Sequence, residues 1–431
     1  MRPHSFILGL TLCLAASCGR KSSTPGLFAI ISDPPNTISH QDQLFFQFDA
    51  VGEGSDAVYE LIEGPPGLTI DEVGLLHWRP AYSDLGVHPI RFEARSGNRT
   101  IQFSFDLRVS QGFNMGVTDS PRDHSTGATE ADRTELFIDH DTHGRMIAFD
   151  GDWRDDITAD GETPQFVQDA LLAAQVYDFH PSIGLSWSDA TGAPDLTSES
   201  DPTNNSWSNA ETRSEFLEVV ERIATDVQPL YFYLGHETNL YYLTHTQAEW
   251  NEWLVTLEAA YAIVHAVSPD TILYTVFQLE RMKGLGGRAG HADAAHFNLV
   301  DELEAGGYVD AIGFTSYPFL EYATPDQLPL AYYDEISLHT GKQVIFSEIA
   351  WPAETAGVFT GSDTDQMMFL QTFFDRVQDV PVEYAVWLYL HDGSKVVSGT
   401  ALSKLGMRSS DGVEIRPVDT MWRDAVVLRQ R

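Results

Sequence analysis

Two glutamates in this sequence stand directly after short apolar runs, where a carboxylate can be presented at the end of a buried strand. Glu237 follows the run of residues 231–234, and Glu348 follows residues 344–346. Runs rich in β-branched and aromatic residues predict buried strands. Pro352 then ends the second strand, because proline cannot donate to a sheet ladder. Two carboxyl groups in one cleft can divide the work between proton donor and nucleophile, as cleavage of a glycosidic bond requires.

The elements that would position these acids begin at about Gly112. From there, strand-like segments alternate with amphipathic stretches such as 164–177, 212–225 and 247–267, which predicts βαβ units. Eight units over roughly three hundred residues are what a (β/α)8 TIM barrel needs. A doubly wound open sheet is the alternative, but it would usually carry a Gly-rich phosphate loop after its first strand, and none follows here. The predicted strands are 113–117, 146–149, 182–186, 231–234, 272–277, 311–314, 344–346 and 384–389.

Polar and aromatic residues follow the predicted strands. In a barrel, the carboxyl ends of all the parallel strands meet at one face. Acids cut glycosidic bonds and flat aromatic rings stack on sugars, so this mixture predicts a carbohydrate site. We expect Glu237 and Glu348 to be the catalytic pair. The predicted substrate-binding residues are Asp150, Trp153, Trp187, His236, Asn239, Tyr317, Trp351 and Trp387.

Both glutamates lie in segments that resemble known motifs. Residues 232–239 read Phe-Tyr-Leu-Gly-His-Glu-Thr-Asn, and residues 346–352 read Phe-Ser-Glu-Ile-Ala-Trp-Pro. The two segments resemble clan A of the retaining (β/α)8 glycoside hydrolases, which holds its acid/base at the end of strand four and its nucleophile at the end of strand seven. Tyr317 and Trp387 match the usual strand-six tyrosine and strand-eight aromatic residue of that clan. Within it, residues 112–395 look most similar to the arabinogalactan endo-β-1,4-galactanase type.

This resemblance implies an O-glycosyl hydrolase that cleaves a β-linked polysaccharide or oligosaccharide with retention of configuration. Glu237 would be the acid/base and Glu348 the nucleophile, with no cofactor and no metal. One residue departs from the pattern, because His236 stands where the clan usually has the Asn that contacts the sugar 2-hydroxyl. Imidazole can donate that hydrogen bond, but an imidazolium would lower the pKa of Glu237 and weaken it as an acid. The alternative is therefore a non-catalytic cell-surface glycan-binding or adhesion protein on a decayed hydrolase barrel.

An all-β pattern over residues 27–110 precedes the predicted barrel of residues 112–431. Segments such as 101–109 alternate apolar and polar residues, with turn-forming residues between them. Short strands with this spacing predict a β-sandwich. The run of residues 59–80 resembles the cadherin-like or Ig-like modules of bacterial surface proteins. We expect Trp78 in this run to be a core residue, with sugar stacking as the alternative.

The first residues predict export. A charged start, an apolar run and small residues form a secretory signal peptide at residues 1–18, too short for a spanning helix. Residues 14–18, Leu-Ala-Ala-Ser-Cys, resemble a bacterial lipoprotein cleavage box with Cys18 as the lipidated residue, followed by a tether at residues 19–26. Ordinary cleavage near Ser17 is the alternative. We therefore expect a bacterial cell-envelope protein, lipid-anchored at the outer membrane or cell surface and otherwise not in the membrane, or a secreted one.

Composition limits the partners. The formal net charge is -37, so nucleic acid is not expected, because phosphate binding needs a basic surface. Cys13 and Cys18 are the two cysteines, which excludes a disulfide or thiolate metal site from the rest of the chain. Residues 139–143, Asp-His-Asp-Thr-His, are expected to form a solvated acidic loop rather than a metal site. Glu280 is expected to be a loop acid or a partner for Arg281. We expect a monomer.

Overall fold

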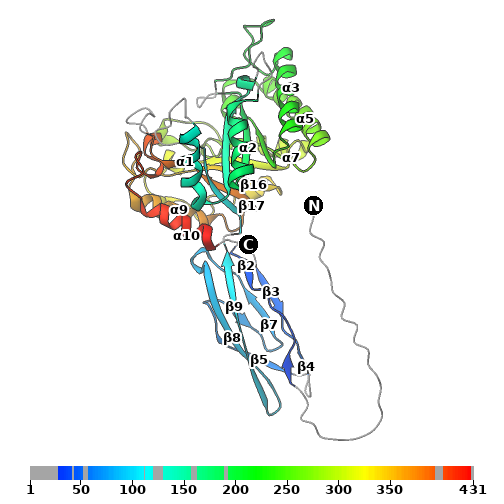
Figure 1. Ribbon diagram of the computed structural model, residues 1–431, viewed down its shortest axis with the longest axis vertical. Helices are drawn as coiled ribbons and strands as arrows, with labels where there is room; N and C mark the ends of the chain where they lie inside the picture. The colour runs from blue at the N-terminus through cyan, green and yellow to red at the C-terminus, as the bar shows by residue number, and fades with distance from the viewer. Residues whose placement is uncertain are drawn as a thin grey trace, which may run out of the picture. The chain divides into compact units, whose positions relative to one another are not determined.

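The chain divides into two units in the computed structural model (Figure 1). The first contains residues 45–77 and 89–105 together with the chain up to residue 34, and the second contains residues 35–44, 78–88 and 106–431. The predicted signal peptide with its Cys18 and the predicted tether of residues 19–26 lie outside the described residues. The structure describes residues 28–40, 43–51, 57–110, 112–119, 130–156, 163–188, 193–393 and 401–428.

The N-terminal region forms β-sheets, as the alternating sequence pattern predicted. Strand β8 (Gly86–Ser96) buries Ile90, Phe92 and Ala94, because successive side chains on a strand point to opposite faces. Trp78 is 1% exposed, which agrees with the predicted core position. The other strands are β1 (Ala29–Ile30), β2 (Thr37–Ser39), β3 (Leu44–Gln47), β4 (Ala50–Val51), β5 (Val58–Glu63), β6 (Thr69–Ile70), β7 (Leu75–Trp78) and β9 (Arg99–Ser110), and the sheet orders are β2-β9-β8-β5, β3-β7-β6 and β1-β4.

Eight strands in the second unit form a closed barrel, which confirms the predicted (β/α)8 fold. Every predicted strand is present. All neighbours pair in parallel, and the first strand pairs with the eighth to close the ring. The strands are β10 (Asn114–Thr118), β11 (Met146–Asp152), β12 (His180–Ser186), β13 (Tyr231–Leu234), β14 (Ile272–Gln278), β15 (Ala311–Ser316), β16 (Gln343–Ile349) and β17 (Val382–Trp387).

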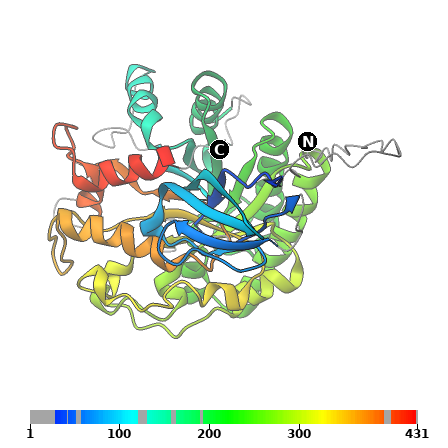
Figure 2. The same cartoon turned by 90° about the horizontal axis from the view of Figure 1, so that it is seen from below.

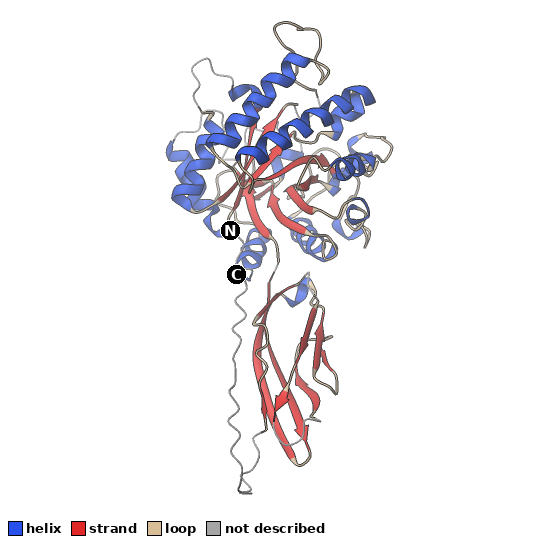
Figure 3. Ribbon diagram, turned by 90° about the vertical axis from the view of Figure 1, so that its right-hand side faces the viewer, coloured by secondary structure: helices blue, strands red, loops and turns tan. Residues whose placement is uncertain are grey.

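Helices surround the barrel strands in the second unit (Figures 2 and 3). The longest, α5 (Gln247–Val267), begins at a capping box in which Thr246 and Glu249 each accept a backbone N–H of the other. Across the described ranges, no helix is long and apolar enough to cross a membrane. The remaining α-helices are α1 (Glu130–His140), α2 (Gln165–Tyr177), α3 (Ala210–Asp226), α4 (Asn239–Thr244), α6 (Leu279–Met282), α7 (Asn298–Gly306), α8 (Ile336–His339), α9 (Asp363–Arg376) and α10 (Pro417–Leu428).

Short elements complete the second unit. The strands β18 (Tyr389–His391) and β19 (Gly406–Arg408) pair in parallel just after the barrel closes. Single 3-10 turns stand mainly in the loops that follow barrel strands. They are Tyr82–Asp84, Asp141–His143, Trp153–Asp156, Gly287–Ala289, Pro318–Leu320, Pro325–Gln327 and Ala401–Lys404.

Tyrosines fill much of the barrel interior. Tyr231, Tyr233, Tyr274 and Tyr384 belong to a buried cluster that is separate from the larger core between strands and helices. The hydroxyl of Tyr274 lies 2.8 Å from Oγ of Ser182 and is also hydrogen-bonded to the hydroxyl of Tyr384. The interior therefore combines large rings with satisfied polar tips, which buried tyrosines require.

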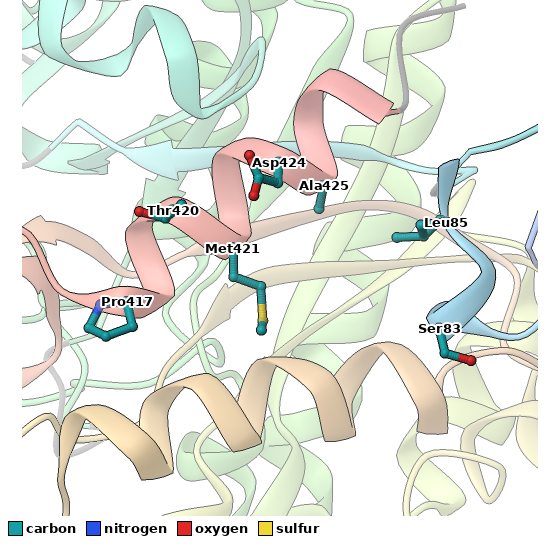
Figure 4. Close-up of a pocket in the computed structure, with 7 residues that line it drawn as sticks. All are labelled: Ser83, Leu85, Pro417, Thr420, Met421, Asp424 and Ala425. Atoms are coloured by element: carbon teal, nitrogen blue, oxygen red, sulfur yellow. The ribbon is translucent and has the colours of Figure 1, made fainter. Parts of the chain in front are cut away.

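A pocket lies along α10 in the second unit (Figure 4). Asp424 contributes the single carboxylate of its lining. The pocket therefore lacks the pair of acids that the sequence predicts for catalysis. The lining residues are Ser83, Leu85, Pro417, Thr420, Met421, Asp424 and Ala425.

Gly184 on β12 provides the space that the Tyr233 ring occupies. A Cβ at Gly184 would lie 1.9 Å from Cζ of Tyr233, far inside van der Waals contact. We therefore expect Gly184→Ala to lower the free energy of unfolding by about 1–3 kcal/mol, the usual effect of overpacking a core. Urea denaturation would measure this change. Gly341→Ala is the matched control, because a Cβ there meets nothing within 4 Å. Equal unfolding midpoints for the two variants would contradict the prediction.

Candidate active site

Glu237 and Glu348 meet at the carboxyl ends of the barrel strands, beside the end of β15. Glu237 follows β13, and Oε1 of its side chain accepts a hydrogen bond from the Thr315 hydroxyl at 2.6 Å. Thr315 is also the register partner of Glu348 on the neighbouring strand β16. The side chain of Tyr317, two residues further on, donates its hydroxyl to Oε2 of Glu348. The predicted catalytic pair thus shares one segment of backbone, residues 315–317.

The turn after β13 aims Glu237 through an uncommon backbone conformation. Glu237 has a φ of 49°, and Gly235 has a φ of 81°. A non-glycine residue in the left-handed region costs on the order of 1–3 kcal/mol, and such strain clusters at functional sites. Gly235 also packs closely against the Trp187 ring, since a Cβ at this position would lie 2.5 Å from Nε1 of Trp187. Backbone bonds from Gly235 to Leu185 at 2.9 Å and from Thr238 to Val276 at 2.9 Å fix the turn to both adjacent strands.

A β-bulge aims Glu348. Phe314 pairs with Phe346, but the next residue of β15, Thr315, pairs with Glu348, so Ser347 is the extra residue on β16. Strict alternation from Ile345, which points into the barrel, would turn Ser347 inward and Glu348 outward. The bulge instead turns Ser347 outward and Glu348 inward, and bulges next to active sites often redirect a side chain in this way. Glu348 therefore faces the barrel mouth on the same side as Thr315.

His236 lies beside the carboxylate of Glu348. Its Nε2 is 3.3 Å from Oε1 of Glu348, an ion-pair contact without hydrogen-bond geometry. Burial opposes a charge on the imidazole, but attraction to Glu348, Glu237 and Asp150 outweighs it and raises the pKa of His236 to about 10. His236 is therefore an imidazolium at neutral pH, and Glu348 has a cation on one side and the Tyr317 donor on the other.

Glu237 has a different environment. Burial raises the pKa of Glu237, and the nearby charge of Glu348 raises it further. His236, the Thr315 hydrogen bond and Arg281 each act in the opposite direction, but burial outweighs them. From the sequence, a charged His236 is expected to weaken Glu237 as an acid. The imidazolium does lower the pKa of Glu237, yet burial outweighs it and the pKa is still raised overall.

Two further carboxylates join the site from β10 and β11. Part of Asp150 is exposed to solvent, but desolvation of its carboxylate by the surrounding protein raises the pKa of Asp150 to about 6, against the opposing effects of His236 and Tyr233. Burial and the charge of Asp150 raise the pKa of Asp119 to about 7. Asp150, a predicted substrate-binding residue, thus belongs to the same electrostatic cluster as His236 and Glu348.

The four predicted tryptophans are placed in the core instead of on an open surface. Trp153, Trp187, Trp351 and Trp387 are all 0% exposed. In this structure none of the four rings offers a face to a sugar, which corrects the prediction of stacking. Their polar atoms serve the fold where they are bonded, since Nε1 of Trp387 donates to the Leu405 carbonyl at 2.9 Å. An indole is apolar enough to favour burial wherever loops can cover it.

Asn239 also has a structural position. It is fully buried, and its side chain brackets the end of β14. Oδ1 accepts the Gln278 N–H at 2.8 Å, and Nδ2 donates to the Gln278 carbonyl at 3.1 Å. Asn239 therefore positions the loop after β13 instead of facing a ligand, which corrects its prediction as a substrate-binding residue.

Two residues near the acids were missed from the sequence. Thr315, the donor to Glu237, is an ordinary strand residue with no local signal. Tyr389 is half-buried, and burial together with the charge of Glu348 raises its pKa, which places it close to that acid. Tyr389 is the last residue of the predicted eighth strand, but the sequence predicts Trp387 as the substrate-binding aromatic residue there. Of the two, Tyr389 is the ring with open surface.

Residues 139–143 are more buried than a solvated loop. His140 and His143 are fully buried, and burial lowers the pKa of both. Nε2 of His143 lies 2.8 Å from Oδ2 of Asp419, and Nε1 of Trp422 donates to the His143 carbonyl at 2.8 Å. His143 therefore docks α10 onto this segment, which corrects the prediction for the histidines, whereas Asp141 and Thr142 are exposed as predicted. In the described part of the chain, no group of three candidate metal ligands occurs.

Three solved structures share this fold. A family 39 glycoside hydrolase from Bacteroides cellulosilyticus is 17% identical, with a TM-score of 0.52 over 93% of this chain and 83% of its own. The protein GH5_18 from Streptomyces cattleya, in complex with GlcNAc, is 13% identical, with a TM-score of 0.56 over 74% of this chain and 81% of its own. The exo-β-1,4-mannosidase Op5Man5 from an Opitutaceae bacterium is 14% identical, with a TM-score of 0.55 over 73% of this chain and 59% of its own. At these identities the likeness establishes the fold.

No protein-family model and no curated protein sequence matches the chain.

The charge on His236 makes stability depend on pH. The pKa of His236 in the folded protein, about 10, lies above the ordinary value of 6.5. The contribution of this charge to the free energy of unfolding is therefore fully present below pH 6.5 and is lost as pH rises through about 10. We expect His236→Asn to lose less unfolding free energy than the wild type between these pH values. Urea denaturation at both ends of the range would measure the difference. His339→Asn is the control, because its surface imidazole pairs with Asp301 at 2.9 Å. If His236→Asn lost as much as the wild type, the charge assignment would be wrong.

Proposed function

We propose that the protein is a glycoside hydrolase that cleaves a β-linked polysaccharide or oligosaccharide with retention of configuration. One observation carries the proposal: Thr315 and Tyr317, on the same end of β15, bind the carboxylates of Glu237 and Glu348. Two acids from different strands are thereby held at one place. Their surroundings suit different roles, because burial raises the pKa of Glu237, whereas the carboxylate of Glu348 accepts the Tyr317 hydroxyl and lies beside the imidazole of His236. The fold shared with three glycosidase structures is consistent with this reaction.

The first half of the reaction would transfer the sugar to Glu348. A carboxylate oxygen of Glu348 attacks the anomeric carbon as the bond from that carbon to the leaving oxygen breaks. Glu237 gives its proton to the leaving oxygen, so the aglycone departs as a neutral alcohol. The products of this step are a glycosyl ester on Glu348 and an ionised Glu237.

The second half would return both acids to their starting states. Ionised Glu237 takes a proton from a water molecule whose oxygen attacks the anomeric carbon, and the ester bond to Glu348 breaks. The change of Glu237 from acid to base follows from the charge on its neighbour Glu348. The charge of Glu348 helps to raise the pKa of Glu237, and that charge is absent while Glu348 is esterified. Glu237 is thus a stronger acid in the intermediate, which favours the ionised form that a base must have.

His236 would support the nucleophile in this scheme. Its imidazolium offsets part of the repulsion between Glu348, Asp150 and Glu237, all of which act on its pKa. A site in which acids outnumber the neighbouring cations also disfavours anionic sugars, so a neutral glycan is the expected substrate class. We propose β-1,4-galactan as the first candidate, on the motif resemblance. Reducing-sugar assays on galactan, mannan, xylan and β-glucans would compare the rates at which the protein hydrolyses these candidate substrates.

Replacement of the two glutamates separates their roles. Glu348→Gln should abolish turnover because the amide cannot form the glycosyl ester. Glu237→Gln should lower kcat by about 10²–10⁴-fold on substrates with poor leaving groups, yet still react once with an activated glycoside that needs no protonation. Burst kinetics and mass spectrometry with an activated 2-fluoro glycoside would follow both effects, with the label expected on Glu348.

The control is Glu302→Gln, which alters a carboxylate that accepts the Trp250 indole N–H at 2.9 Å and should keep full activity. Label on a residue other than Glu348 would refute the assigned nucleophile. A wild-type protein that binds glycans but turns over none of them would instead favour the non-catalytic alternative.

We also propose that Cys18 anchors the protein to the bacterial cell envelope, as the sequence at residues 14–18 suggests. Cells grown with radiolabelled palmitate should label the wild-type protein and the Cys13→Ser control. Cys18→Ser should remain unlabelled and leave the membrane fraction. Label retained on Cys18→Ser would exclude this residue as the lipidation site.

A further inference from the structure

Three consecutive hydroxyls at the end of β15 contact three different glutamates. The Thr315 hydroxyl donates to Glu237 at 2.6 Å, the Ser316 hydroxyl donates to Glu280 at 3.2 Å, and the Tyr317 hydroxyl donates to Glu348. Side chains on a strand alternate between its two faces. Thr315 and Tyr317 therefore share the face that holds the catalytic pair, and Ser316 points to the opposite face, toward Glu280.

Glu280, on the short helix α6, contacts residues 316–317 from behind the site. Its Oε1 accepts hydrogen bonds from the Ser316 hydroxyl and, at 2.9 Å, from the Tyr332 hydroxyl. The backbone N–H of Tyr317 also acts on this carboxylate, since it lowers the pKa of Glu280. The Ser316 hydroxyl lies 3.0 Å from the hydroxyl of Tyr333. Because Ser316 has one proton and gives it to Glu280, Tyr333 must donate to Ser316.

The burial of Glu280 is costly and needs a reason. Its side chain is 0% exposed, and Oε2 has no hydrogen-bond partner in the described structure. A buried carboxylate without a paired cation is among the least favourable groups in a core. The nearby cations are engaged elsewhere, Arg281 with Asp293 and Lys283 with Glu335, which corrects the predicted Glu280–Arg281 pair. Burial accordingly raises the pKa of Glu280 to about 7.

We propose that Glu280 is a positioning residue for the reaction, which holds residues 315–317 from behind so that Thr315 and Tyr317 keep Glu237 and Glu348 in place. This inference rests on the proposed function. Glu280 does not touch the substrate in this assignment, and it acts only through the strand end. Its hydrogen bond with Ser316 goes to the segment that both catalytic acids share, which gives the costly burial of this acid a role.

Two substitutions at Glu280 test this role. Glu280→Ala removes every contact to residues 316–317 and should lower kcat by about 10–100-fold with KM changed less than about threefold, because a displaced catalytic group costs rate more than binding. Glu280→Gln should keep kcat within about threefold of wild type. Its Oε1 can retain both hydroxyl donors, and its amide nitrogen would occupy the place of Oε2, which has no partner. Steady-state kinetics at one pH measures both.

Glu383→Ala is the matched control. Glu383 accepts the Tyr231 hydroxyl at 2.6 Å at the opposite end of the barrel, so the variant also loses a tyrosine–glutamate bond and some stability. Its kcat should equal that of the wild type. If Glu280→Ala does not fold, Tyr332→Phe and Ser316→Ala each remove one contact of Glu280 without a large cavity. Each should lower kcat with KM held, and wild-type kcat in both would overturn the proposal.

Crystal structures of the variants provide a test that does not need turnover. Glu280→Ala should lose the 2.6 Å contact from Thr315 to Glu237, and Glu280→Gln and Glu383→Ala should keep it. An inactive wild type would refute the proposed function, and the same structures would still decide whether Glu280 holds the strand end. An unchanged contact in Glu280→Ala, wild-type kcat in that variant, or a Glu280→Gln as impaired as Glu280→Ala would overturn the assignment.

Discussion

The site depends on a single extra residue in strand β16. In a pleated strand, a shift of one residue moves a side chain to the opposite face of the sheet. Ser347 introduces that shift just before Glu348, so the carboxylate turns into the barrel mouth and pairs in register with Thr315. Without the bulge, Glu348 would point toward the helices with Phe346, which packs in the outer core. The contacts of Glu348 with Tyr317 and His236 all follow from this one irregularity.

The electrostatics of the site balances desolvation against paired charge. Burial in a protein disfavours every ionised group, and here it acts on Asp119, Asp150 and Glu237 in the same direction. The imidazolium of His236 is the counter-charge for this cluster, and the acids in turn keep it protonated. The strained φ of Glu237 adds a further cost. The hydrophobic core around the barrel must offset these costs of desolvation and backbone strain, and the burial of its large aromatic residues provides the stabilisation.

The aromatic residues of the chain serve the scaffold more than the site. Trp187 packs edge-on against Trp207, with ring centroids 5.2 Å apart, and lies under the turn that carries Glu237. Inside the barrel, the ring of Tyr233 fills the space that Gly184 leaves. Such packing fixes the strand ends rigidly, and a preorganised site needs rigid support because small displacements of a catalytic group reduce the rate strongly.

The sequence by itself determined the barrel, its eight strands and the two glutamates at the ends of strands four and seven. These features are local, since apolar runs, helical periodicity and an acid after a strand can each be recognised within a few residues. Tertiary structure alone decided which face Glu348 takes, because the bulge at Ser347 depends on pairing with β15. It also decided that Trp153 and Trp351 are buried, since an indole suits a core or a sugar equally well. The charge of His236 and the burial of Glu280 likewise arise from residues distant in sequence, because desolvation and Coulomb interactions depend on the spatial neighbours of a group.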